Sequence, residues 1–526
     1  MLPYLVVIPL LISVFMFVFS FARFGRAVAV IAQTFFTGFA FYIFMLARQE
    51  TIYDVIGGFD SVLGIILRVD NVSSALILLT TVIFLAVSIY SFDVKQSKLY
   101  WLLMFIWQGM IIGVFLTRDL FNIFVLMEVS TVVISVLFMY NRHSRSMYDG
   151  VIYIMVNIVA MQFYLFGLAY LYMITGALDI NVITVRIQEL EASQLVLPYA
   201  LIMTGMAFKC ALLPIFSWIP KVRAIPRAPS PVAAIISGLH VKCIIFVIIQ
   251  INDIFYMLDI SIYFIIIGII TAIGGIIMSL GQKDIKLILA YSSIAQVGLI
   301  IIGLNLGGSY AFIGSVYHMV NHALFKVALF LGSGMIIEIY GTRDISKISG
   351  IFKLNPLFAI INLLAIAAIM GTPIFNGFIS KYFIMSDLGG PLFWIISIIN
   401  LGTLTVFIRY ATMMFGKPTV NIKNQKMPSA KVLSVSVLGV LCLVLGLFSA
   451  NSIQALFNVP VDISFAGYIE KVVIFAISFV AAIFLYKYIF NKNILIKKIG
   501  ALDCSFKSIC FSLGCFFGII LLFVGI

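Results

Sequence analysis

Long apolar stretches alternate with short polar ones over the whole chain. Most of them are close to the roughly 20 residues that an α-helix needs to cross the hydrocarbon core of a bilayer. The pattern predicts an all-α polytopic membrane protein with sixteen transmembrane spans. In chain order these are residues 2–22, 27–47, 72–91, 99–116, 120–140, 150–173, 196–216, 230–250, 261–280, 286–304, 310–336, 356–385, 392–415, 431–449, 471–490 and 508–526.

The composition agrees with this class and excludes others. Apolar residues make up 63% of the chain and charged residues only 10%, whereas roughly 25% of residues are charged in soluble domains. The net charge of +13 does not indicate nucleic acid binding, because the basic residues lie in short loops without interleaved aromatic residues. The six cysteines form no CxxC pair and lack histidines at metal-binding spacing. We therefore predict no cofactor.

The basic residues also predict an orientation. Most of the 33 lysines and arginines lie in or beside the odd-numbered connections, beginning with the one between spans 1 and 2. The positive-inside rule assigns such loops to the cytoplasm. We therefore expect a multi-pass protein of the cell (plasma) membrane with both termini outside. A miscounted helix would disrupt this alternation, so the alternation supports the number of sixteen.

Two short sequence matches predict an internal repeat. Pro214-Ile-Phe in span 7 recurs as Pro373-Ile-Phe in span 12, and Arg118-Asp-Leu before span 5 recurs as Lys283-Asp-Ile before span 10. Both matches relate a span to the fifth span after it, so the two copies cross the membrane in opposite directions. An inverted repeat of this kind is typical of transporters. The prolines predict breaks in spans 7 and 12.

Several ionisable side chains lie deep inside predicted spans, where they are costly and indicate a functional site. Glu128 in span 5 is the only acid at such depth. Lys209 lies in span 7, Lys242 in span 8 and Lys381 near the end of span 12. One carboxylate can neutralise only one ammonium group, and burial favours the neutral form of the others. The set is typical of a chain of proton-exchange sites, although Glu128 and Lys209 also fit a structural ion pair and Lys381 also fits an extended side chain that reaches the interface.

Span 11 carries three more such groups, His318, His322 and Lys326, at the spacing i, i+4, i+8 that places them on one helix face. This arrangement suits a proton relay. The two histidines have the spacing of metal ligands, but the sequence offers neither a glutamate between them nor an evident third ligand. His240 in span 8 fits either a proton site or a packed, hydrogen-bonded histidine.

The sequence resembles, at these residues, the antiporter-like subunits shared by Mrp-type multisubunit Na+/H+ antiporters, respiratory complex I and membrane-bound hydrogenases. The resemblance covers about residues 1–470 and rests on six ordered motifs. They are Arg118–Glu128, Ala207–Pro220, Ala228–Lys242, Leu289–Gly298, His318–Lys326 and Gly371–Lys381. Asp119–Phe124 and Leu171–Leu178 are most similar to the D-type member of the Mrp antiporters.

The resemblance implies a core of fourteen helices, in which spans 4–8 and 9–13 are inverted repeats and spans 7 and 12 are broken. Residues 1–470 then form the antiporter-like core, and residues 471–526 form an additional pair of helices. The resemblance also implies roles. These are a modulated pair for Glu128 and Lys209, a link for Lys242, a central relay for His318, His322 and Lys326, and an outlet for Lys381. His240 departs from the D-type pattern, in which an apolar residue is more common.

We therefore expect a proton-translocating subunit of an Mrp-type Na+/H+ antiporter, with other integral membrane subunits and lipid as partners. The alternative is a pump subunit of a redox-driven complex, such as a membrane-bound hydrogenase or a relative of complex I. The sequence carries no redox centre of its own, so whether the parent complex is an enzyme stays open. It also leaves open whether Na+ crosses this subunit.

Overall fold

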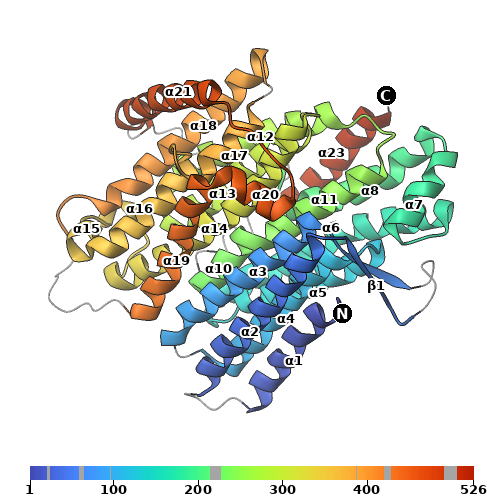
Figure 1. The fold of residues 1–526 in the computed structure, drawn as a ribbon, viewed down its shortest axis with the longest axis horizontal. Helices are drawn as coiled ribbons and strands as arrows, with labels where there is room; N and C mark the ends of the chain where they lie inside the picture. Colours follow the sequence, from blue (N-terminus) through green and yellow to red (C-terminus); the bar gives the residue numbers. More distant parts are fainter. Residues whose placement is uncertain are drawn as a thin grey trace.

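The computed structural model describes residues 1–19, 24–58, 64–94, 96–213, 225, 227–386, 388–419, 428–490 and 506–525. Most of the chain forms a bundle of long helices that share one general direction (Figure 1). Within the described residues, 13 helices are long and apolar enough to cross a membrane. The three remaining predicted spans correspond to α1, α8 and the α16–α17 pair. The predicted polytopic helical fold is therefore confirmed.

The N-terminal part consists of three helices and a hairpin. Its elements are α1 (Tyr4–Phe19), α2 (Phe24–Ala47), β1 (Ile52–Ile56), β2 (Ile65–Val69), α3 (Asn71–Tyr90) and the short η1 (Ser91–Asp93). The two strands pair antiparallel with Ile52 opposite Val69. Asp70 then begins α3 through a capping box with Ser73, which satisfies backbone N–H groups that a helix start leaves open. This hairpin was not predicted from the sequence, because five-residue strands give little signal beside apolar helices.

Two sets of five membrane crossings follow. The first set consists of α4 (Lys98–Leu116), α5 (Leu120–Phe138), α6 (Ser144–Thr175), α7 (Ile180–Arg186), η2 (Ile187–Glu189), α8 (Ala192–Cys210), α10 (Ser230–Ile235), η3 (Ile236–His240) and α11 (Val241–Ile254). The second set consists of α12 (Ser261–Gly281), α13 (Ile285–Leu304), α14 (Ser309–Tyr340), η4 (Ile345–Lys347), α15 (Ile351–Leu354), α16 (Pro356–Met370), α17 (Asn376–Ile384), α18 (Gly390–Ala411) and η5 (Thr412–Met414).

The two sets share their local construction. α6 and α14 each have 32 residues and end at a glycine in the left-handed region, which glycine adopts without steric cost. In each set an aspartate begins the second crossing and forms an isolated bridge with another aspartate after the third. The same interval separates Asp119 from Asp284, Asp179 from Asp344 and Gly176 from Gly341. These correspondences agree with the predicted inverted repeats.

The predicted break in span 12 lies between α16 and α17. Gly371 ends α16 with a φ of 74°, a conformation that favours glycine. Gly377 lets α17 pass close to α16, since a Cβ there would lie 1.9 Å from the carbonyl oxygen of Ala368. The break therefore depends on two glycines as well as on Pro373.

α8 ends in a similar way, with Ala211 at a φ of 71°. That conformation crowds a residue with a Cβ and costs about 1–2 kcal/mol. Pro214, which the sequence analysis identifies as the break in span 7, lies outside the described residues.

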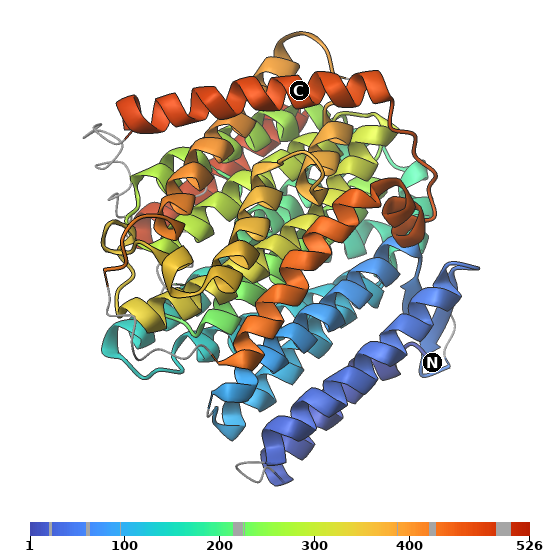
Figure 2. The ribbon, with the colours of Figure 1, turned by 60° about the vertical axis from the view of Figure 1, so that its left-hand side comes forward.

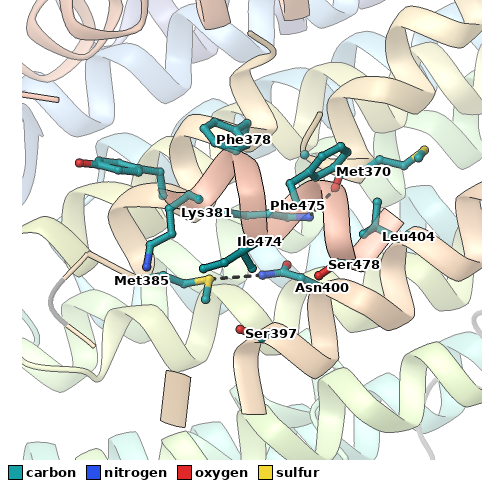
Figure 3. Close-up of a pocket in the computed structure, with 13 residues that line it drawn as sticks. Met370, Phe378, Lys381, Met385, Ser397, Asn400, Leu404, Ile474, Phe475 and Ser478 are labelled. Atoms are coloured by element: carbon teal, nitrogen blue, oxygen red, sulfur yellow. Dashed lines mark hydrogen bonds between the residues drawn. The ribbon is translucent and has the colours of Figure 1, made fainter. Parts of the chain in front are cut away.

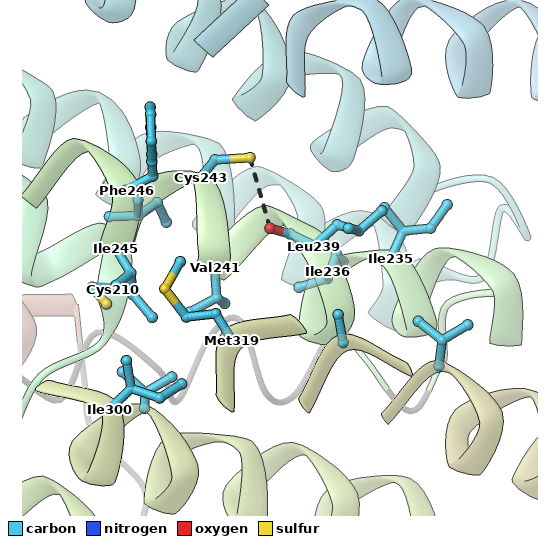
Figure 4. Packing of buried hydrophobic residues seen from close by; sticks show 14 of the residues in the cluster. Cys210, Ile235, Ile236, Leu239, Val241, Cys243, Ile245, Phe246, Ile300 and Met319 are labelled. Atoms are coloured by element: carbon cyan, nitrogen blue, oxygen red, sulfur yellow. Dashed lines mark hydrogen bonds between the residues drawn. The ribbon is translucent and has the colours of Figure 1, made fainter. Parts of the chain in front are cut away.

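Span 8 contains a π turn, η3, between α10 and α11. π turns are rare and are often found at functional sites. Figure 4 shows the tightly packed apolar side chains around this stretch, including Leu239, Val241 and Met319. Gly238 allows α14 to approach, because a Cβ there would lie 2.4 Å from Val327 Cγ2. The second half of the bundle therefore packs directly against the irregular part of span 8.

The C-terminal part consists of α19 (Ser429–Leu447), α20 (Ser449–Phe457), α21 (Phe465–Phe484), η7 (Leu485–Phe490) and α23 (Phe506–Gly525). α23 packs on α8 and α6, whereas α21 packs mainly along α18. Figure 2 shows α21 along one side of the molecule, inclined to most other helices. Only 6% of its most apolar window is buried. The predicted boundary between the core and the additional helices, at residue 470, falls inside α21.

Candidate functional site

The acid and the lysine of the first repeat lie together. Lys209 Nζ is 3.3 Å from Glu128 Oε1, and it also donates to Thr131 Oγ1 at 2.6 Å and to the Met127 carbonyl at 3.4 Å. One turn of α5 supplies all three acceptors, which match the three donors of an ammonium group. The Lys209 side chain is 1% exposed and that of Glu128 is 25% exposed. The pair thus has one dry end and one end near the surface.

Lys242 lies where the two repeats meet. Its Nζ donates to the Ser237 carbonyl at 2.7 Å and lies 2.5 Å from His322 Nδ1 of α14. The Ser237 carbonyl belongs to the π turn, so the irregular backbone supplies an acceptor at membrane depth. No acid lies within salt-bridge distance of Lys242 in the described part of the chain. The contact with His322 joins the first repeat to the second.

α14 holds its three predicted groups close to one another and to neighbouring helices. His318 lies 2.8 Å from Ser380 Oγ of α17 through Nδ1, and 3.0 Å from Gln296 Oε1 of α13 through Nε2. The rings of His318 and His322 have centroids 6.3 Å apart. His318 therefore connects α14 with the helix after the break, while His322 connects it with Lys242.

Lys326 completes this face of α14. Its Nζ donates to the Leu289 carbonyl at 2.9 Å and to Ser292 Oγ at 2.5 Å, and it lies 5.4 Å from the centre of the Phe407 ring. Both hydrogen-bond acceptors are neutral and belong to α13. Burying an ammonium group without an acid is costly, so the polar atoms and the ring face are what stabilise a charge here.

Lys381 binds the end of the broken helix. Its Nζ donates to the carbonyls of Ile369 and Met370 at 3.2 and 3.4 Å. These are among the last carbonyls of α16, which have no partner within the helix and form the negative end of its dipole. Figure 3 shows Lys381 beside a cavity of about 60 Å³ that Ser397, Asn400 and Ser478 also line. A polar cavity needs only about 10–15 Å³ to hold a water, so this one has room for water.

α21 forms one side of this cavity. Lys471 lines it, with its Nζ 4.4 Å from the centre of the Phe393 ring and 3.2 Å from Glu470 Oε1. Tyr468 accepts a hydrogen bond from the backbone N–H of Ile374 at 3.2 Å. Because Ile374 lies in the break with a φ of 80°, α21 stabilises the strained backbone beside Lys381.

His240 lies beside a different helix. It is 1% exposed and its ring lies 6.1 Å from that of Trp107 in α4. The structure thus places the other seven of the eight predicted residues in three local groups. They are Glu128 with Lys209, Lys242 with the α14 set, and Lys381 at the break.

The neutral partners of these groups were not predicted from the sequence. Their hydroxyl, amide and carbonyl groups contact the lysines and histidines directly, yet serine and threonine are common in membrane helices. One signal was available, since Thr131 lies one turn after Glu128 on the same face. The missed partners are Thr131, Ser237, Ser292, Gln296 and Ser380.

Two lysines that are the first residues of predicted spans 10 and 14 are buried in the bundle. Lys431 is 5% exposed and its Nζ lies 2.6 Å from Glu338 Oε2. Lys286 donates to the Ala228 carbonyl at 3.0 Å. Among the described residues, no group of three His, Cys, Asp or Glu side chains lies close enough to hold a metal ion.

Comparison with known proteins gives one family match and several relatives. Residues 117–408 match the family model described as NADH:quinone oxidoreductase/Mrp antiporter, TM. The chain is 29% identical over 336 residues to the D subunit of the Na(+)/H(+) antiporter of Alkalihalophilus pseudofirmus, covering 62% of this chain and 68% of that protein. It is 28% identical over 441 residues to the N subunit of the NADH-quinone oxidoreductase of Desulforudis audaxviator, covering 78% of this chain and 87% of that protein.

A solved structure shares the fold. A chain of the Mrp complex from Dietzia sp. DQ12-45-1b superposes with a TM-score of 0.80 at 22% identity, covering 95% of this chain and 99% of that chain. Because 95% of the chain is covered, the match includes most of the part that follows residue 408, and the likeness of fold extends beyond the residues that the family model covers.

Proposed function

Because the chain belongs to the NADH:quinone oxidoreductase/Mrp antiporter transmembrane family, we propose that it is a proton-translocating subunit of a multisubunit membrane complex. The observation that carries this proposal is a series of buried lysines and histidines that starts at a single acid. Intramembrane ionisable groups of this kind form proton relays in pumps and transporters. Lysine and histidine nitrogens exchange H+, whereas hard metal cations prefer oxygen ligands, so H+ is the ion that this series suits.

Glu128 and Lys209 form the control point of the series. While they are together, the carboxylate stabilises the buried ammonium group and holds its proton. If the carboxylate moves away, the charge on Lys209 loses its counter-ion in a dry environment, and the proton is driven to another base. The partial exposure of Glu128, at 25%, leaves it free to respond to a neighbouring subunit.

Lys242 and His322 pass this change to the second repeat. They are in direct contact across the boundary between α11 and α14. A proton on either group raises the cost of a proton on the other, because like charges repel strongly at low dielectric. His318 and Lys326 extend the series along α14 toward the break and toward α13.

Lys381 is the outlet. The α16 carbonyls favour its charged form, and the adjacent cavity offers space for water through which a proton can leave. Water of this kind requires several polar partners, which Ser397, Asn400 and Ser478 provide. Lys471 of α21, which pairs with Glu470, lines the same cavity.

We favour an Mrp-type Na+/H+ antiporter as the parent complex, because the D-type motifs agree with the antiporter relative named above. The alternative is a redox-driven complex, for which the relative named as a NADH-quinone oxidoreductase subunit is the supporting observation. Purification from the native membrane and mass spectrometry of the co-purifying subunits distinguish the two. Hydrophobic membrane partners without iron–sulfur cysteine motifs support the antiporter, whereas a partner with such motifs supports the redox complex.

Proton transport is tested with the assembled complex in proteoliposomes that contain a pH-sensitive dye. Lys209→Met is expected to reduce proton flux at least about tenfold, the factor that corresponds to ~1.4 kcal/mol. Lys431→Met is the matched control, because Lys431 is also a largely buried lysine, at 5% exposed, that is paired with an acid but lies outside the series. If Lys209→Met assembles and transports like the control, the proposed role of the series is wrong.

The topology belongs to the same proposal. We place the odd-numbered connections in the cytoplasm and both termini outside the plasma membrane, as the distribution of basic residues favours. Residues 1–470 form the transporting core, and residues 471–526 form the peripheral pair. Cysteine accessibility at Ser144, which follows span 5, and at Thr51, which follows span 2, is expected to report opposite sides of the membrane.

A further inference from the structure

A basic cavity of about 350 Å³ lies where α5 and α14 end and α6 and α10 begin. We call it the arginine pocket. Its lining, within the described part of the chain, consists of polar and basic residues and includes no acid. The lining residues are Asn141, His143, Arg145, Ser146, Arg227 and Arg343.

The pocket has a fixed frame and an excess of positive charge. Asn141 Nδ2 donates to the Arg227 carbonyl at 2.9 Å, which joins the α5–α6 connection to the chain before α10. Arg227 pairs with Asp149, and Arg343 Nε lies 3.2 Å from Asp284 Oδ2. Each aspartate balances one arginine, and neither lines the pocket. Arg145 has no acid within salt-bridge distance in the described ranges, so its charge remains uncompensated.

The beginning of α6 adds to this positive potential. α6 has 32 residues, and its N-cap His143 makes no side-chain capping hydrogen bond. The N–H groups of the first turn therefore remain open at the positive end of the helix dipole. Arginine side chains beside open N–H groups are the combination that binds phosphate.

The position of the pocket relates it to the membrane. It lies at the level of the helix ends, three residues before α10 and three after α14. Immediately beyond it, α6 presents an apolar outer face on which Met147, Tyr148 and Val151 are 50%, 65% and 43% exposed. In the topology proposed above, this is the cytoplasmic side, where anionic lipids are enriched.

We propose that the arginine pocket binds the phosphate of an anionic phospholipid whose acyl chains lie along this outer face of α6. The required ligand chemistry is a phosphate group, and the adjacent apolar face selects a lipid over free phosphate. Such a lipid bridges Arg227, which lies just before the last crossing of the first repeat, and Arg343 in the second repeat, and so ties the two repeats together at one membrane surface.

The test compares Arg145→Gln with Arg142→Gln in the purified complex. Arg142 is the matched control, because it is exposed, three residues away and outside the lining. Native mass spectrometry measures phosphatidylglycerol retained after exchange in phosphatidylcholine nanodiscs with and without phosphatidylglycerol. Each basic residue near an anionic surface contributes about 1 kcal/mol, so Arg145→Gln is expected to lower retention roughly fivefold, while Arg142→Gln leaves it unchanged.

A parallel arm adds inorganic phosphate without anionic lipid. Thermal stabilisation by phosphatidylglycerol that Arg145→Gln removes supports the proposal. Equal retention by both variants overturns it, as does stabilisation by inorganic phosphate alone, or crosslinking of residue 145 to another subunit in place of lipid. The proposal does not depend on proton transport, because lipid retention can be measured equally well in a complex that carries Lys209→Met.

Discussion

The two repeats have the same frame but different chemistry. The three pairs of bridging and capping residues described above are all separated by the same number of residues along the chain. The same separation identifies equivalent positions of the two repeats in the site. The equivalent pairs are Glu128 and Ser293, Thr131 and Gln296, Tyr153 and His318, Asn157 and His322, and Met161 and Lys326. In the first repeat Lys209 bonds to an acid. In the second repeat, Lys326 and His318 bond to neutral groups.

This difference indicates how two copies of one fold can have different roles in proton transport. A lysine beside an acid has two states that differ in position, because the acid can approach or withdraw. A lysine or histidine among hydroxyl and carbonyl groups changes mainly through its own proton, since its partners carry no charge to move. The first repeat is therefore suited to sensing and the second to passing protons on.

The two lysines nearest the helix breaks show the same contrast. Lys209 lies in the last turn of α8, before its break, whereas Lys381 comes from beyond the break and turns back to the carbonyls of α16. The positive charge of Lys209 at the first break is stabilised by Glu128. The positive charge of Lys381 at the second break is stabilised by backbone carbonyls. A conformational change is therefore expected to affect the first site more strongly.

Moving the acid to the equivalent position is the strongest way to break the comparison. Glu128→Ser combined with Ser293→Glu keeps the net charge but places the carboxylate in the second repeat. Proton flux is expected to fall at least about tenfold, because Lys209 loses its counter-ion. Flux is measured in proteoliposomes and assembly by size-exclusion chromatography. Since Ser293 is buried, Glu128→Ser alone serves if the double variant does not assemble, and wild-type flux in either would contradict the account.

Exchanging the residues at the two helix breaks is expected to have opposite effects. Gly371→Ala forces a Cβ into the left-handed region and within 3.1 Å of Lys381 Cδ, at a cost of about 1–3 kcal/mol. Ala211→Gly relieves about 1–2 kcal/mol of crowding but costs about 0.5–1 kcal/mol in chain entropy, so it stabilises by up to about 1.5 kcal/mol. Thermal unfolding of the complex checks the signs. Shifts of the unfolding temperature in the same direction for both variants would contradict this description of the two breaks.

The smallest predicted effect concerns α21. Tyr468→Phe removes the hydrogen bond to the N–H of Ile374 and should cost about 1 kcal/mol. A small fall in thermal stability and a modest loss of flux are expected, because the backbone beside Lys381 loosens. Tyr488→Phe, at an exposed position of η7, is the control. A variant at residue 468 that matches this control would indicate that α21 does not support the outlet.

Much of the fold follows from the sequence because membrane helices have a strong pattern. The sixteen spans, the repeat and the break near Pro373 all depend on apolar length, short matches and proline. The buried charges also stand out, since a lysine among apolar residues has few soluble-protein explanations in such a chain.

The remaining features depend on contacts that the chain pattern does not record. The π turn at Ile236–His240 has no sequence signal of its own, and the hydroxyl partners such as Ser292 look like ordinary helix residues. Lys431 lies at a helix end in sequence, yet it is buried because α19 packs against α14 and α3. The arginine pocket assembles from three connections that are distant in sequence.

The central claim is that both repeats form one proton route joined at Lys242. The most direct test is proton flux through complexes that carry Lys242→Met, with Cys243→Ser as a neighbouring buried control. The account predicts that the Lys242→Met complex assembles but transports protons at background level. The substitution removes the contact of Lys242 with His322, through which the first repeat passes protons to the second. Flux equal to that of the Cys243→Ser complex would contradict it.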